Sequence, residues 1–173
     1  KYVIYSSDAK NIVPVSGTPA SANLFVYDRA LGTNYILTTN GASTIASTPD
    51  GRYVVFGGAL AQGGTANVYV WDSQLKQRIF TNNPLNSVGN IAISTNGLWI
   101  TYILGSSSLR VIDRLTKSNI TVSAGPFGFR SNPRFSGDGR YLVYATSASN
   151  SPADVNLSRD VYIFDVLTRS NSL

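Results

Sequence analysis

The fold is decided by one stretch of the sequence, Thr48-Pro-Asp-Gly-Arg-Tyr-Val-Val-Phe56, in which a tight turn leads into a short apolar segment. Asp-Gly is a preferred dipeptide of tight β-turns, since both residues tolerate a positive φ. Residues 53–56 are apolar at every position, whereas a strand with one wet face would alternate apolar and polar residues. We therefore predict a strand that is covered on both faces.

The same kind of strand recurs along the chain. Its four copies start at Lys1, Arg52, Leu98 and Arg140, so successive starts are 51, 46 and 42 residues apart. A second type of strand follows each copy and ends in aspartate: Leu24-Phe-Val-Tyr-Asp28, Val68-Tyr-Val-Trp-Asp72, Leu109-Arg-Val-Ile-Asp113 and Val161-Tyr-Ile-Phe-Asp165. Repetition at such a period is typical of repeat architectures, which include propellers.

Two further strand types complete the repeating unit. A third type is expected at 35–38, 78–81 and 120–123, and a fourth type at 44–47, 90–94 and 133–136. Each fourth-type segment is followed by Asp-Gly or Asn-Gly, and no stretch shows a helical period. The unit is thus four short antiparallel strands, and stacking such sheets around an axis covers both faces of each.

We therefore predict an all-β chain folded as a single β-propeller domain over 1–173. It has about four blades of four-stranded antiparallel sheet, approximately 1–38, 44–81, 90–123 and 133–173, and the first and last blades are expected to be incomplete.

The repeat also resembles a known family. Its pattern of Pro/Gly-Asp-Gly-Arg-Tyr followed by an apolar run resembles the WD-like repeats of TolB-type β-propellers, most clearly at 48–53 and 137–141. The third copy departs, because Asn96 replaces the aspartate and Leu98 the arginine. Residues 6–14 and 23–29 are similar to a subset found in large secreted bacterial proteins. That resemblance implies an extracellular or cell-surface setting in a bacterium, with the periplasm as the alternative.

Composition argues against catalysis within this chain. The sequence contains no His and no Cys, and all nine acidic residues are Asp. The Ser-His-Asp and Cys-His mechanisms therefore lack a base, and the usual zinc sites lack their ligands. We expect no enzyme activity, no catalytic residue and no cofactor.

The charge and hydropathy patterns argue against two kinds of partner, nucleic acids and membranes. Ten Arg and four Lys are scattered without a run of three, so we expect no nucleic-acid partner. No apolar stretch is long enough for a membrane span, so we expect no membrane insertion.

Four aspartates are candidate structural residues. Asp28, Asp72, Asp113 and Asp165 each open the turn to the third strand, where a carboxylate can accept backbone N–H groups. Their recurrence in every repeat favours turn capping over catalysis, since a catalytic residue need appear only once.

Other candidate sites lie outside these turns. Two sequons begin at Asn119 and Asn156 and are candidates for glycosylation, with glycans as a possible partner. Three further aspartates do not have the Asp-x-Asp-x-Asp spacing of a calcium loop, so we expect no metal site: Asp8, Asp154 and Asp160. Phe127 and Phe129 are the aromatic residues expected outside the regular strands.

The chain starts with a first-type strand and stops where a third-type strand begins, so both terminal blades should be unfinished. Exposed strand edges attract other strands. Three explanations stay open: a longer chain closes the ring, neighbouring copies supply the missing strands head-to-tail, or four blades close on themselves.

The functional prediction is a non-catalytic extracellular structural or interaction module, which assembles into a filament or belongs to a larger surface protein. Its expected partners are other copies of itself or the rest of a longer chain. The alternatives are the gating propeller of a larger hydrolase, resembling prolyl-oligopeptidase-type enzymes, and a periplasmic TolB-like adaptor that binds peptide or protein.

Overall fold

The computed structural model of the chain describes residues 1–13, 23–42, 44–60, 64–84, 86–106, 108–124, 132–147, 152, 155 and 158–173. These residues form fifteen β-strands and no helix. Among them, accordingly, there is no helix that could span a membrane. The prediction of an all-β fold is confirmed.

The strands form four antiparallel sheets in which neighbours in the sheet are also neighbours in the sequence. We call these sheets the first to fourth blades. The first blade holds β1 (Tyr2–Ser7), β2 (Asn23–Asp28) and β3 (Thr33–Thr38), and the second holds β4 (Thr44–Ser47), β5 (Tyr53–Gly58), β6 (Asn67–Asp72) and β7 (Gln77–Asn82). The third holds β8 (Val88–Ile93), β9 (Trp99–Leu104), β10 (Ser108–Asp113) and β11 (Asn119–Ala124). The fourth holds β12 (Arg134–Phe135), β13 (Tyr141–Thr146), β14 (Asp160–Asp165) and β15 (Ser170–Ser172).

The first blade therefore has three strands, and the fourth blade ends in a strand of only three residues. The strand pairing repeats from blade to blade. The aspartate that ends each second-type strand lies opposite an aromatic residue of the first-type strand, as in the pairs Tyr2–Asp28 and Tyr53–Asp72.

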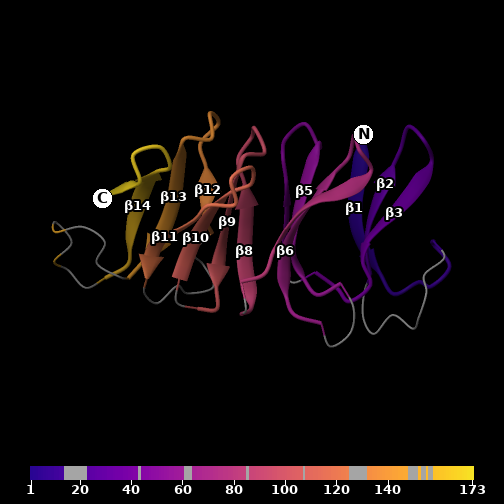
Figure 1. The fold of residues 1–173 in the computed structure, drawn as a ribbon, viewed down its shortest axis with the longest axis horizontal. Coiled ribbons are helices and arrows are strands. Elements are labelled where there is room, and N and C mark those ends of the chain that lie inside the picture. Colours follow the sequence, from indigo (N-terminus) through magenta and orange to yellow (C-terminus); the bar gives the residue numbers. More distant parts are fainter. Residues whose placement is uncertain are drawn as a thin grey trace.

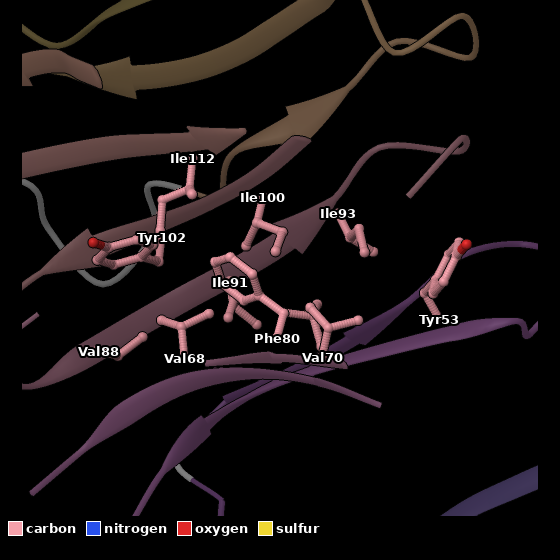
Figure 2. Close-up of a cluster of buried hydrophobic side chains, with 11 residues drawn as sticks. Tyr53, Val68, Val70, Phe80, Val88, Ile91, Ile93, Ile100, Tyr102 and Ile112 are labelled. Atoms are coloured by element: carbon pink, nitrogen blue, oxygen red, sulfur yellow. The ribbon is translucent and has the colours of Figure 1, made fainter. Parts of the chain in front are cut away.

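The core consists of three clusters, each shared by two neighbouring blades. Successive side chains of β5 point to opposite faces, so Tyr53 and Val55 join the cluster with the third blade, while Val54 and Phe56 join the cluster with the first blade. Figure 2 shows the cluster between the second and third blades, in which Ile100 is fully buried. The apolar run in this strand is thus covered on both faces, as predicted.

The blades lie in a row, with β1–β3 at one end and β13–β14 at the other (Figure 1). The leading strands β4, β8 and β12 of neighbouring blades lie close to one another. One hydrogen bond joins two of them directly, since the Ile91 N–H donates to Thr44 Oγ1 at 3.1 Å. The structure fits an incomplete four-bladed propeller, as predicted, and in the part of the chain that the structure describes the first and fourth blades lie at opposite ends of the row (Figure 1).

Candidate functional site

The four predicted aspartates lie in equivalent turns after the second-type strands. Asp28 Oδ1 accepts the N–H groups of Ala30 at 3.0 Å and Leu31 at 3.3 Å. The same pair of bonds, to the second and third following residues, is made by Asp72, Asp113 and Asp165. The fourth following residue has a positive φ in every blade: Gly32, Lys76, Lys117 and Arg169. One carboxylate oxygen is therefore used to build the turn.

The second carboxylate oxygen binds a cation in three of these turns. Asp165 Oδ2 accepts from Arg140 of its own blade at 2.7 Å, and this hydrogen bond lowers the pKa of Asp165 to about 2. Asp72 forms an ion pair with Arg52 at 3.5 Å, again within one blade. Asp28 differs, because its cation comes from the next blade.

Lys76 joins the first and second blades through polar contacts. Its ammonium donates to Asp28 Oδ2 at 2.6 Å and to Tyr2 Oη at 3.1 Å. Tyr2 Oη in turn donates to the Ser73 carbonyl at 3.3 Å. The bond from Lys76 lowers the pKa of Asp28 and also that of Tyr2. Sequence spacing did not reveal this contact, since the two partners are 48 residues apart.

A second recurring turn was predicted only in part. The Asp-Gly and Asn-Gly turns do precede the first-type strands, but a hydroxyl two residues before the Asp or Asn organises them. Thr48 Oγ1 donates to Asp50 Oδ1 at 2.6 Å and accepts the Tyr53 N–H at 3.0 Å. Ser94 and Ser136 make the equivalent contacts. The signal was available, because a Ser or Thr stands at this position in all three copies.

The glycosylation candidates differ in what the structure describes. Asn119 is the exposed first residue of β11, and its side-chain amide donates to the hydroxyl of Tyr102 at 3.3 Å. Burial raises the pKa of that tyrosine. A glycan on Asn119 would have to be attached at the nitrogen that makes this bond. Asn156 lies outside the described residues.

Of the remaining candidates, the structure describes two, Asp8 in the first blade and Asp160 in the fourth. Asp8 is exposed just after β1, and Asp160 is the half-buried first residue of β14. Asp154, Phe127 and Phe129 lie outside the described residues.

An open groove of about 470 Å³ runs along the leading strands. Its walls include Ser47 and Ile45 of β4, Asn90 of β8, and Asn132 and Arg134 at β12. Asn90 has a positive φ of 44° at a bulge in the pairing of β8 with β9. Amide and hydroxyl groups and one guanidinium suit a polar ligand, but this set offers neither a nucleophile–base pair nor a metal-binding cluster.

The outer face of the fourth blade is apolar and open. It carries Tyr141, Val143, Val161 and Ile163, which are 36%, 39%, 60% and 41% exposed. The equivalent residues of the second blade are Tyr53, Val55, Val68 and Val70, and all four are buried against the third blade. The fourth blade thus presents, uncovered, the type of surface that elsewhere forms a junction between blades.

The outer face of the first blade is aromatic. Tyr5 stacks on Phe25 with the ring centroids 5.3 Å apart, and Val3 beside them is 46% exposed. Tyr27 pairs with Val3 across the two strands and therefore lies on the same face. Among the described residues, the fourth blade thus has an open and mainly aliphatic face, whereas the aromatic face of the first blade is only partly exposed, because Phe25 is 1% exposed and Tyr5 and Tyr27 are half-buried. These faces are the candidate functional surfaces of the described residues.

No protein-family model and no curated protein sequence matches this chain. Solved structures do match. The tricorn protease aligns with a TM-score of 0.64 and 13% identity over 86% of this chain and 14% of its own. TolB from Acinetobacter baumannii aligns with a TM-score of 0.60 and 18% identity over 90% of this chain and 38% of its own.

Hydrazine synthase from Kuenenia stuttgartiensis aligns with a TM-score of 0.56 and 19% identity over 91% of this chain and 44% of its own. The chain thus spans less than half the length of each of these three proteins. At such identities the likeness concerns the fold alone, which is a TolB-like β-propeller.

Proposed function

We propose that this chain is a non-catalytic propeller module that works by docking, with the open face of its fourth blade packed on the partly exposed outer face of the first blade of another copy. The observation that carries the proposal is the exposure of Val143, Val161 and Ile163 at positions that are buried in the second blade. Burying apolar surface contributes roughly 25 cal/mol per Å², which makes such a face favourable to cover.

The aliphatic face of the fourth blade and the aromatic face of the first blade have the same complementary side-chain types as two of the junctions inside the chain. Where the first and second blades meet, aliphatic Leu24 and Val26 pack against aromatic Tyr69 and Trp71. Where the third and fourth blades meet, aliphatic residues again pack against an aromatic set: Leu109 and Val111 against Tyr144, Tyr162 and Phe164. An aliphatic fourth-blade face on an aromatic first-blade face would repeat this arrangement.

Docking of this kind would be head-to-tail. The two faces belong to opposite ends of the row (Figure 1), so each copy offers one face and accepts the other. Such a heterologous contact closes into a ring or continues into a filament, depending on the rotation it imposes. This geometry supports the proposal of a structural role in a ring, a filament or a larger surface protein.

The composition supports a role without catalysis. The sequence has no His, Cys or Glu, which are among the commonest acid–base groups, and the four predicted aspartates are engaged as turn caps. We propose a place outside the cell or at its surface, because residues 6–14 and 23–29 resemble a segment found in large secreted bacterial proteins. Protease treatment of intact source cells tests this setting, since an intracellular chain would survive until the cells are lysed.

Sedimentation velocity across micromolar to millimolar concentrations tests the docking. We expect association that increases with concentration, into either a closed ring or an open series of oligomers, and we expect the double variant Val143→Lys/Ile163→Lys to stay monomeric. Leu115→Lys is the matched control, because Leu115 is apolar and 69% exposed but lies in a turn away from both faces. A monomer at every concentration, or equal association of the double variant and the control, would contradict the proposal.

A second candidate function is a propeller portion of a larger enzyme. The likeness to the tricorn protease, of which this chain spans 14%, favours it, since that protein is a protease in which such a fold forms a part. In that case catalysis belongs to a separate domain, and the groove along the leading strands would admit substrate or bind a peptide. A Gly-x-Ser-x-Gly segment in an adjoining α/β region of the gene would support this candidate, and its absence there would count against it.

A further inference from the structure

β1 is an edge strand at a place where the other three blades have a partner strand. Within the described residues, β1 pairs with β2, whereas the equivalent strands β5, β9 and β13 also pair with the leading strands β4, β8 and β12. One hydrogen bond shows which backbone groups of β1 point toward β2 and which point away from it. Lys1 O accepts the Arg29 N–H at 3.0 Å, so alternate residues 1, 3 and 5 bond to β2. The N–H and C=O groups of residues 2, 4 and 6 therefore point to the open side.

The second blade shows how the same alternation of backbone groups is used when a leading strand is present. Arg52 O accepts the Ser73 N–H of the β6 side, while Tyr53 O accepts the Thr48 N–H of the β4 side. Tyr53 also donates its own N–H to Thr48 Oγ1. Tyr2 is the residue of β1 that corresponds to Tyr53. Its N–H and C=O therefore point to the place that a leading strand occupies in the second blade.

Two hollows flank β1 on the side of the second blade. One has a volume of about 250 Å³ and is lined by Tyr2, Ile4 and Val54 together with the turn at 47–51. The other has a volume of about 260 Å³ and is lined by Ile4 and Tyr5 with Leu24 and Ile45. Ile4 borders both, so the space follows the strand; the first hollow has mixed polar and apolar walls, and the second is mainly apolar. A paired strand would lie there, about 4.8 Å from β1.

We infer that the open edge of β1 binds an extended peptide segment in antiparallel pairing, with the sequence character of this chain's own leading strands. Such a segment has small and aliphatic residues in its middle and ends in Ser or Thr, as in Thr44-Ile-Ala-Ser-Thr48 and Asn90-Ile-Ala-Ile-Ser94. The terminal hydroxyl would accept the Tyr2 N–H, as Thr48 and Ser94 do for the equivalent residues.

The inference rests on the proposed docking function and names a second surface for it, which is a backbone edge and not a side-chain face. Strand addition to an exposed edge is an established mode of peptide recognition, in which main-chain bonds give affinity and side-chain hollows give specificity. The pairing also continues an existing arrangement, because leading strands of neighbouring blades already lie side by side at β4–β8 and β8–β12.

The probe is an acetylated peptide that copies residues 44–51, Thr-Ile-Ala-Ser-Thr-Pro-Asp-Gly, with a fluorophore at its end. In the chain, Ala46 pairs with Val55, whose backbone points toward β4, so the Ala46 N–H faces the partner strand while that of Ser47 faces away. N-methylation at the Ala46 position of the peptide should therefore weaken binding about tenfold, since it removes a donor and leaves an acceptor unpaired. N-methylation at the Ser47 position is the matched control and should leave the affinity unchanged.

Fluorescence polarisation with the whole chain measures these affinities, and NMR hydrogen exchange locates the site. We expect saturable 1:1 binding, with slower amide exchange at residues 2, 4 and 6 and no change at 3 and 5. No saturation below about 1 mM peptide, equal loss with both methylated peptides, or protection elsewhere would overturn the inference. The Val143→Lys/Ile163→Lys variant separates the two proposals, because it should lose self-association and keep peptide binding.

Discussion

Gly97 offers the sharpest test of how the blades are joined. It lies in the turn before β9 with a φ of 70°, and its Cα faces the ring of Tyr53 in the preceding blade. A Cβ at this position would lie 2.2 Å from Tyr53 Cδ2 and 2.4 Å from Cε2. The ring cannot easily move aside, because the guanidinium groups of Arg52 and Arg114 both lie 4.8 Å from its centroid.

The cost of Gly97→Ala can be worked out in two parts. A left-handed conformation costs an alanine about 1–2 kcal/mol. Forcing a packed ring to shift costs about 1–3 kcal/mol more. We therefore expect the free energy of unfolding to fall by about 2–5 kcal/mol. Gly105→Ala, in the same blade, is the control for the first part alone, since its φ is 60° and nothing lies within 4 Å of an added Cβ.

Urea unfolding followed by circular dichroism measures both variants against the parent chain. Any effect of the added methyl group on the unfolded chain is the same for the two substitutions and cancels in the comparison. We expect Gly97→Ala to be the less stable by at least about 1 kcal/mol, which is about 2–4 °C in Tm for a chain of this size. If the two variants were equally stable, the close packing of this turn on Tyr53 would not matter, and our account of the junction would fail.

Three further predictions concern charge and core packing. Because Arg140 holds the pKa of Asp165 at about 2, below its ordinary value, the stabilisation is present above about pH 4 and is lost as the pH falls toward 2; Arg140→Gln should therefore flatten the dependence of the urea midpoint on pH in this range, and an unchanged slope would contradict the ion pair. Lys76→Met should lower Tm and raise the pKa of Asp28, because it removes the ammonium group that bonds this carboxylate. Carbon-detected NMR titration would follow the carboxyl group, and an unchanged titration midpoint would show that Lys76 does not hold it. Ile100→Ala should cost about 2–5 kcal/mol in urea unfolding because Ile100 is fully buried, whereas Leu115→Ala should cost less than about 0.5 kcal/mol because Leu115 is exposed; similar losses would refute the assigned core.

The repeat could be predicted from the sequence because local chemistry determines it. The fourth-type segment expected at 44–47 is β4, Thr44–Ser47, and the apolar run at 53–56 lies within β5. The prediction was less accurate where strands bend or shorten. The segment expected at 90–94 is β8, which begins two residues earlier and contains a bulge, and the segment expected at 133–136 is reduced to β12.

The candidate surfaces could be predicted only in outline. The sequence indicates unfinished terminal blades, but not which side chains they expose, because that depends on which face of each strand meets its neighbour. In the structure, successive side chains of β5 alternate between the two neighbouring blades, and Val55 faces the following blade. Val143 is the equivalent of Val55, and it lies with Ile163 on the face that is left open in the fourth blade. The contact of Lys76 with Asp28 could not be foreseen for a similar reason, since it depends on how far one blade is rotated relative to the next.

Each core cluster is shared by only two adjacent blades, and this has a consequence for how such a protein changes over generations. The stability of an arrangement of this kind is approximately a sum of unit terms and nearest-neighbour terms. Duplication or deletion of one unit of roughly 45 residues then disturbs a single junction and leaves the others intact. A gene built in this way can lengthen or shorten by recombination between its own copies, and a repeat that has drifted, such as the one carrying Asn96, is tolerated as long as its two neighbours still fit.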